Sequence, residues 1–338
     1  MLRHTVEKLP TNWARVRPVA MVGIGVGAAT LWLSTRGIDV ESLKHALSAS
    51  RPFWTMSAVL SVLATVAAGV VRWRLLFYPD ARQRSWSTLT MAMIVGQMLN
   101  IALPFRAGEI ARAAWVSRAE RLAIGHVLGT MAVERLSDLV AVGVTVGALL
   151  ILTTVPDWMA AGGRALMSTA VLAAALIGLI ALRGRQLTAI AVRIVRSLPA
   201  LLARRLEPLL TSAVDGTRIL QHRETTLLAS LLAVVVLLLA ASTNYLLFVA
   251  FDLPVSAVAA ILLVIALQIG NTLLPVPGNV GVFHYVTVLT LGTFSVDRES
   301  ALAYAVVLHL VALGPKVLAG AAILLIAGRQ RVAITGDR

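Results

Sequence analysis

Residues Leu253–Val296 form a run of 44 positions without Asp, Glu, Lys or Arg. A helix crosses about 30 Å of hydrocarbon with roughly 18–20 residues, so the run is too long for one crossing. Hydrophobic residues make up 58% of the chain and charged residues 14%, whereas soluble domains carry about 25% charged residues. This composition excludes an ordinary soluble enzyme and a disordered chain, and predicts an integral membrane protein.

Other uncharged runs are long enough to cross a bilayer, and none alternates like a strand, so we expect an all-α fold. They are Pro18–Thr35, Phe53–Val71, Ser85–Phe105, Leu139–Pro156, Ala165–Leu182 and Thr225–Phe251, with a last run, Ser300–Gly328, interrupted only by Lys316. The first run resembles a signal sequence but has no convincing cleavage site, so we expect a retained anchor. The chain has no cysteine, which excludes disulfides and thiolate sites.

Lys and Arg residues indicate the topology. Residues 1–17 hold four, 72–84 four, 183–224 eight and the C-terminal tail three, whereas 154–164 holds one. By the positive-inside rule both termini are cytoplasmic, in the plasma (inner) membrane of the cell. The pattern fits about six full spans if Ser85–Arg121 and Leu253–Val296 are re-entrant hairpins that enter from opposite sides. Eight or more simple spans are the alternative, which places four arginines of 106–121 outside.

The segment 183–224 interleaves its arginines with Ile and Leu residues. Beside membrane spans this pattern favours amphipathic helices that lie on anionic lipid. A solvated linker is the alternative. The net charge of +14 therefore predicts contact with a membrane surface and not with nucleic acid.

Residues 94–104 and 265–275 are related by an internal repeat with five identities in eleven positions, at an offset of 171. The same offset places Phe53–Val71 onto a later span that runs in the opposite direction. Inverted repeats with broken helices are typical of many transporters. We therefore expect a first membrane repeat with the anchor in 1–182, a connector in 183–224 and a second, inverted repeat in 225–338. Two unrelated proline-kinked helices are the alternative.

The segment that follows Pro104 is a candidate anion site. A helix beginning after the proline presents unpaired N–H groups, and Arg106 and Arg112 add guanidinium groups suited to phosphate oxygens. Arg106 and Glu109 could instead neutralise each other. Asn100 and Asn271 each precede a proline by four residues, where an amide can satisfy freed backbone groups; we expect the two to approach each other near the midplane.

Further ionisable residues lie within or beside apolar runs, where they usually face a cavity or a partner. Glu134 and Asp138 share a helix face, and Arg135 can reach Asp138. His309 and Lys316, seven residues apart, also share a face, so we expect both groups to line one polar cavity between the halves. Separate ion pairs, or carboxylates at head-group depth, are the alternatives. No nucleophile or metal cluster accompanies the carboxylates. The lone His284 is more often structural than ligand-binding.

Three motifs together resemble the membrane region of lysylphosphatidylglycerol synthase/flippase proteins over roughly residues 20–328. They are Asn100-x-x-Leu-Pro104-x-Arg106-x-Gly108-Glu109-x-x-Arg112, Glu134-Arg135-x-x-Asp138 and Pro275-x-Pro277-Gly278-x-x-Gly281. The resemblance implies a lipid flippase-like module, with Pro277 and Gly278 in the substrate region. It also implies that a chain without the aminoacyl-transfer domain does not make lysyl lipid. Family members often carry an acidic residue where this chain has Phe283 and His284.

We therefore expect a flippase or secondary transporter, without cofactor or metal, that moves an anionic or lipid-linked amphiphile between leaflets. The substrate would be a phospholipid or a polyprenyl-phosphate sugar. No Gly-x-x-x-x-Gly-Lys-Ser/Thr loop occurs, so ATP use by that route is excluded. A membrane-embedded transferase, with Glu134 or Asp138 as base, and a scaffold for a partner enzyme of lipid or glycan synthesis are the alternatives.

Overall fold

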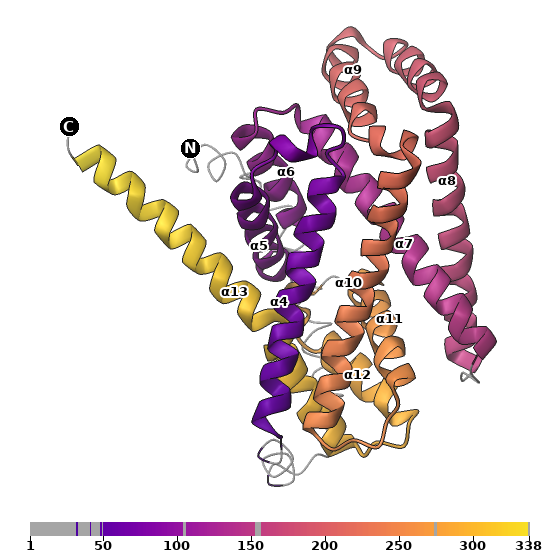
Figure 1. Cartoon of the computed structure of the whole chain (residues 1–338), viewed down its shortest axis with the longest axis vertical. Coiled ribbons are helices and arrows are strands. Elements are labelled where there is room, and N and C mark those ends of the chain that lie inside the picture. The colour runs from indigo at the N-terminus through magenta and orange to yellow at the C-terminus, as the bar shows by residue number, and fades with distance from the viewer. Residues whose placement is uncertain are drawn as a thin grey trace. The chain divides into compact units, whose positions relative to one another are not determined.

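The computed structural model describes residues 50–103, 106–152, 157–273 and 276–336, together with Trp32, Glu41 and Ser48. Within these residues all regular structure is helical (Figure 1). The chain is therefore an all-α membrane protein, as the uncharged runs predict. The expected anchor Pro18–Thr35 lies outside the described residues apart from Trp32. The end of the expected Leu139–Pro156 span lies outside them as well.

The described residues form the helices α4–α13 and three short 3₁₀ turns. The helices are α4 (Pro52–Leu75), α5 (Trp86–Ala102), α6 (Ala107–Ala119), α7 (Ile124–Leu152), α8 (Asp157–Arg196), α9 (Ala200–Asp215), α10 (Arg223–Ala250), α11 (Ala257–Leu273), α12 (Val282–Gly292) and α13 (Arg298–Gly336). The 3₁₀ turns are Asp80–Gln83, Arg218–Gln221 and Pro277–Asn279.

Four helical segments in the described part of the chain are long and apolar enough to cross a membrane. They are Pro52–Leu75, Ala161–Gly184, Arg223–Ala250 and Arg298–Ile326. Many large apolar side chains on these segments are exposed, among them Leu172 and Leu318. A soluble monomer rarely exposes so much contiguous apolar surface, whereas lipid covers it readily. By contrast, α11 and α12 have 17 and 11 residues and are short for a full crossing.

The chain reverses between α11 and α12 at the proline-glycine motif. α11 ends at Leu273 and α12 begins at Val282, with backbone φ angles of 65° at Gly278 and 87° at Gly281. Both values lie in the left-handed region that glycine adopts most readily. A Cβ atom on Gly270 of α11 would lie 2.9 Å from Val286 of α12. The two helices therefore pack against each other as a hairpin.

A second reversal separates α5 from α6, which meet at two glycines. A Cβ atom on Gly108 would collide with the carbonyl oxygen of Gly96 and would lie 2.6 Å from Oδ1 of Asn100. A Cβ atom on Gly96 would lie 3.0 Å from Cβ of Arg112. The position of Gly108 has no room for a side chain, and a side chain at Gly96 would press against Arg112, so both glycines favour the close approach. At both the α5–α6 and the α11–α12 position, a helix is followed by a break and a second helix, as the sequence predicts.

The helix boundaries follow the offset of the sequence repeat. α5 and α11 have 17 residues each, and their first residues, Trp86 and Ala257, lie 171 positions apart. The first residues of α4 and α10, Pro52 and Arg223, are separated by the same 171 positions. The two copies of the repeated sequence therefore form helices with matching starts.

The chain divides into two compact units that interleave in the sequence. The first comprises residues up to Val66, Met93–Arg112 and residues from Leu238 onward, and it contains both helix breaks. Its core is built from α10–α13 and the first half of α4; the buried residues include Phe248, Leu263 and Tyr304. The Tyr304 hydroxyl donates to the backbone oxygen of Asn244 at 3.2 Å.

The second unit comprises Ala67–Ala92 and Ala113–Leu237, and α7, α8 and α9 pack together in it. Close packing again depends on small residues, because a Cβ atom on Gly129 would collide with Ala213 of α9. α8 contains a non-helical residue, Arg183, with φ −128° and ψ 20°. Arg183 is the residue at which the sequence predicts that a span ends and the basic connector begins.

Candidate functional site

A polar cluster lies beside the α5–α6 break and brings together three predicted site residues. Asn100 Nδ2 donates to Glu109 Oε1 at 3.4 Å, and Nη1 of Arg112 lies 3.8 Å from Glu109 Oε2. Arg112 is only 5% exposed. Because Gly96 and Gly108 have no side chains, α5 approaches α6 closely enough for this cluster to form.

Arg106 stands apart from that cluster at the start of α6. Its backbone is left-handed (φ 51°), its carbonyl oxygen accepts from Glu109 N at 2.9 Å, and the residue is exposed. Among the described residues no carboxylate lies within ion-pair distance of Arg106, whereas Glu109 lies beside Arg112. The expected alternative, neutralisation of Arg106 by Glu109, is therefore not the arrangement found.

Two buried acceptor atoms of α5 have no hydrogen-bond partner in the described structure. They are Oε1 of Gln97 and Oδ1 of Asn100, one turn apart on the same face. Buried polar atoms are almost always satisfied by protein, water or ligand. This face of α5 thus supplies acceptors beside the cationic groups of α6.

A second cluster of charges lies in the other unit and is centred on Arg72. The sequence analysis places this residue in the basic segment 72–84. α4 continues to Leu75, so Arg72 is buried inside the helix packing and not in the following turn. Arg72 donates to Asp138 at 2.5 Å and to Glu134 at 3.2 Å. Arg135 reaches Asp138 at 3.4 Å, as its spacing predicts. In the sequence, Glu134 and Asp138 have one arginine nearby, Arg135. This imbalance was the signal that a further cation has to pair with the two carboxylates.

His284 is not a lone residue, because α12 and α13 bring it to His309. The two imidazole rings stack with centroids 5.0 Å apart and 22° between planes, and Phe283 presents its ring edge to His309. Nδ1 of each histidine is buried and has no hydrogen-bond partner in the described residues.

Lys316 lies on α13 directly after Pro315, one turn before Gly320. A Cβ atom on Gly320 would lie 2.8 Å from Met98 of α5, so this face of α13 meets α5. Within the described part of the chain no carboxylate lies at ion-pair distance from Lys316. The side chains of Asn271 and Pro277 lie outside the described residues. The predicted approach of Asn100 to Asn271 therefore stays a prediction.

The comparison with known families decides the classification. The family model for the lysylphosphatidylglycerol synthase TM region matches residues 20–320. The chain belongs to this family. A search of curated proteins gave no match to the chain.

In this member of the lysylphosphatidylglycerol synthase TM-region family, two of the three resemblance motifs coincide with the helix breaks. The motif containing Asn100, Glu109 and Arg112 builds the α5–α6 cluster, and the proline-glycine motif builds the turn before α12. At the position where members often carry an acid, this chain places His284 against His309. The described residues contain no group of three or more His, Cys, Asp or Glu that could hold a metal ion.

Proposed function

We propose that the protein is a flippase or secondary transporter that moves an amphiphile with an anionic or lipid-linked head group between leaflets. The observation that carries the proposal is the α5–α6 break, where exposed Arg106 has no carboxylate partner among the described residues and adjoins the Asn100–Glu109–Arg112 cluster. Guanidinium groups and free N–H groups at a helix start suit a phosphate. The substrate class is therefore a phospholipid or a polyprenyl-phosphate sugar.

The architecture proposed for this activity is an inverted repeat of about six full spans and two re-entrant hairpins. It is supported by the matching starts of α5 and α11 and by the shortness of α11 and α12. The repeats would occupy 1–182 and 225–338, with 183–224 as a connector on anionic lipid. Both termini would be cytoplasmic, in the plasma membrane. Broken helices near the midplane place substrate sites at repeat interfaces in many transporters.

Two further features of the first unit fit transport of a charged head group. Lys316, in a segment long enough to span the membrane, has no carboxylate partner in the described structure. Charges at such depth are usually functional because their desolvation is costly. The stacked His284 and His309 are the second feature, and in this proposal His309 takes up the proton that drives transport.

A membrane-embedded transferase is the less favoured alternative. Its proposed base would be Glu134 or Asp138, but Arg72 donates hydrogen bonds to both carboxylates. Because these hydrogen bonds tie both carboxylates into one structural ion cluster, neither is free to face a substrate as a general base. We therefore propose that the protein is not an enzyme and that a separate partner enzyme makes its lipid.

Reconstitution tests the transport proposal. Full-length protein in liposomes is supplied with fluorescent phosphatidylglycerol, and the fraction reaching the opposite leaflet is followed by quenching from outside. Arg106→Gln should lower affinity about ten- to hundredfold, the equivalent of about 1.5–3 kcal/mol for a charge-assisted contact. Arg106→Lys should also weaken it, because the guanidinium fork is lost.

Arg121→Gln is the matched control. Arg121 is also an exposed arginine with left-handed backbone (φ 55°), but it lies in the turn after α6 and not at the break. Equal transport by folded Arg106→Gln and wild-type protein would contradict the site. Turnover of a radiolabelled lipid-linked sugar by purified protein, without transport, would instead support the transferase.

A further inference from the structure

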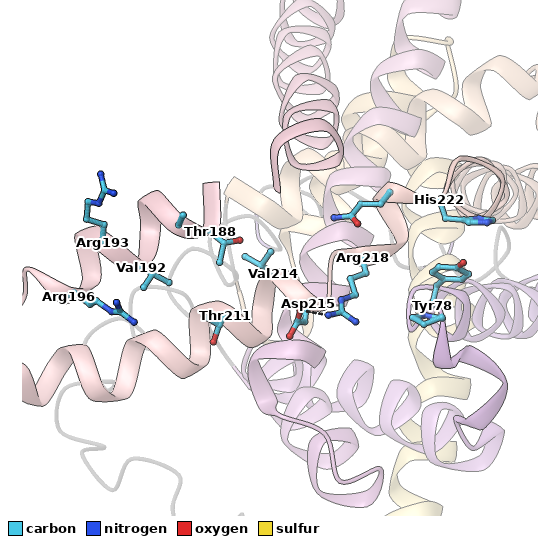
Figure 2. A pocket seen from close by; sticks show the side chains of 13 residues that line it. Tyr78, Thr188, Val192, Arg193, Arg196, Thr211, Val214, Asp215, Arg218 and His222 are labelled. Carbon is cyan, nitrogen blue, oxygen red and sulfur yellow. Dashed lines mark ion pairs between the residues drawn. The ribbon is translucent and has the colours of Figure 1, made fainter. Parts of the chain in front are cut away.

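A groove of about 1110 Å³ lies in the second unit, between the C-terminal part of α8 and α9, and extends to Tyr78 and His222 (Figure 2). None of its lining residues belongs to the polar cluster at the α5–α6 break or to the Arg72 cluster. The groove thus needs an explanation of its own.

Arginines from both sides line the groove, and two of them are tied to carboxylates. Arg196 donates to Glu207 through Nη2 at 2.5 Å and through Nε at 3.1 Å, which links the end of α8 to α9. Arg218 lies 3.1 Å from Asp215. Arg193 is exposed, and the described residues offer it no carboxylate at ion-pair distance. After these pairings the lining retains one surplus positive charge, near Arg193 and Arg196.

Two rings line the opposite end of the groove (Figure 2). The rings of Tyr78 and His222 lie 4.7 Å apart at their centroids, with 30° between their planes. Nδ1 of His222 is engaged by the Thr225 hydroxyl at 2.8 Å, which leaves Nε2 for a ligand. Val192, beside the two arginines, and Val214 contribute apolar surface, and the Asp215–Arg218 pair lies between Val214 and the rings (Figure 2). The groove therefore combines a cationic end, a mixed apolar and polar wall, and two rings at the other end.

The position of the groove along the chain indicates what occupies it. The membrane-spanning part of α8 ends at Gly184, directly after the non-helical Arg183. The lining begins at Thr188, about one helical turn later. On α9, Leu201 is 78% exposed and Leu202 50%, so this helix offers apolar surface of its own. Phospholipid head groups lie at this depth, just beyond the hydrocarbon.

We propose that the groove binds the phosphate-bearing head group of an anionic phospholipid as a fixed ligand, with Arg193 as the charged contact. Phosphate oxygens accept charge-assisted hydrogen bonds from guanidinium groups, and Val192, next to Arg193, offers apolar contact to the first methylenes. This site is independent of the transport site at the α5–α6 break. It is also more specific than attraction of the whole basic connector to a negative surface, because it depends on one arginine among eight.

Native mass spectrometry of the full chain in detergent tests the site. The protein is titrated with phosphatidylglycerol and, separately, with zwitterionic phosphatidylcholine. Wild type should retain phosphatidylglycerol at least tenfold more tightly. Arg193→Gln should weaken phosphatidylglycerol binding about tenfold or more. Arg204→Gln is the matched control, since it removes the same charge from an exposed position on α9 outside the groove; it should change binding less than twofold.

A second variant and a soluble competitor complete the test. Ala189→Phe fills the groove without changing charge and should also weaken binding, while helicity measured by circular dichroism stays at the wild-type level. Equal losses in Arg193→Gln and Arg204→Gln would overturn the proposal in favour of diffuse attraction. Equal retention of the two lipids would overturn it too. If glycerol 3-phosphate binds as tightly as the lipid and depends equally on Arg193, the ligand is a soluble phosphate ester and the lipid assignment fails.

Discussion

The carboxylate of Glu134 lies 3.2 Å from the guanidinium group of Arg72, and the two side chains are 6% and 3% exposed. Arg72 also donates to Asp138, so one buried cation compensates two carboxylates. Each partner would be expensive to bury alone, because water is replaced by an apolar surrounding. The three groups therefore act as one structural unit that joins α4 to α7.

Removing this cation should destabilise the protein strongly. Arg72→Met leaves Glu134 and Asp138 without their main partner, and breaking a buried pair typically costs about 3–5 kcal/mol. We expect a large fall in the midpoint of thermal unfolding in detergent. Arg135→Met is the control; Arg135 is 44% exposed, and such pairs contribute at most about 1 kcal/mol. Similar midpoints for the two variants would show that the Arg72 pairs contribute little.

The glycine contact between α5 and α6 should tolerate no added methyl group. Gly108→Ala forces a Cβ atom against Gly96 and Asn100, and overpacking of this kind costs about 1–3 kcal/mol. Gly178→Ala, on the spanning part of α8, meets nothing within 4 Å and gains helix propensity of about 1 kcal/mol. Thermal unfolding should therefore shift down for Gly108→Ala and not for Gly178→Ala. A shift of the same sign in both would refute the close contact.

Lys316 should be dispensable for folding and required for substrate. Lys316→Met removes a charge with no carboxylate partner in the described structure, so the unfolding midpoint should stay constant or rise. Binding of phosphatidylglycerol at the transport site should nevertheless weaken at least tenfold, measured in the Arg193→Gln background to silence the groove. A loss of stability as large as that of Arg72→Met would identify Lys316 as part of a structural ion pair.

The Arg196–Glu207 link should survive mild acid. The hydrogen bonds from Arg196 lower the pKa of Glu207 from its ordinary value. A lowered pKa means that the pairing is present above the ordinary titration range of glutamate and is lost as the pH falls through the lowered value. Spin labels on cysteines placed in α8 and α9 should report the same distance between the helices at pH 5 as at neutral pH. Below the lowered pKa of Glu207 the distance should be longer. In Glu207→Gln the distance should be the same at both pH values; a pH-dependent change in that variant would assign the effect to another group.

The re-entrant topology can be tested by cysteine labelling, since the chain has no cysteine of its own. A cysteine at Arg118, in the last turn of α6, should react only with a reagent applied to the cytoplasmic side. A cysteine at Ser295, after α12, should react only from the outside. Labelling of the Arg118 position from the outside alone would show that these segments are simple spans and not re-entrant hairpins.

The helices, their breaks and the bend in α8 could be predicted from the sequence, because their physical causes lie within a few neighbouring residues. Uncharged runs predict helices in lipid, since a helix satisfies all backbone groups within one segment. Prolines and glycines predict the breaks after α5 and α11, and the onset of arginines predicts the bend at Arg183. The Asn100–Glu109 contact was within reach too, because nine residues separate the partners across one turn.

Contacts between distant helices were decided only by the tertiary structure. Arg72 donates a hydrogen bond to Glu134, which lies 62 positions later in the sequence. α12 packs against α13, so His284 stacks on His309. The groove beside Arg193 is lined by residues of two separate helices, α8 and α9, which Arg196 and Glu207 link. Hydrophobic pattern and backbone hydrogen bonding determine that each helix forms and which face is apolar. They do not determine which neighbour that face meets, because the partner depends on the fit of side chains over the whole contact.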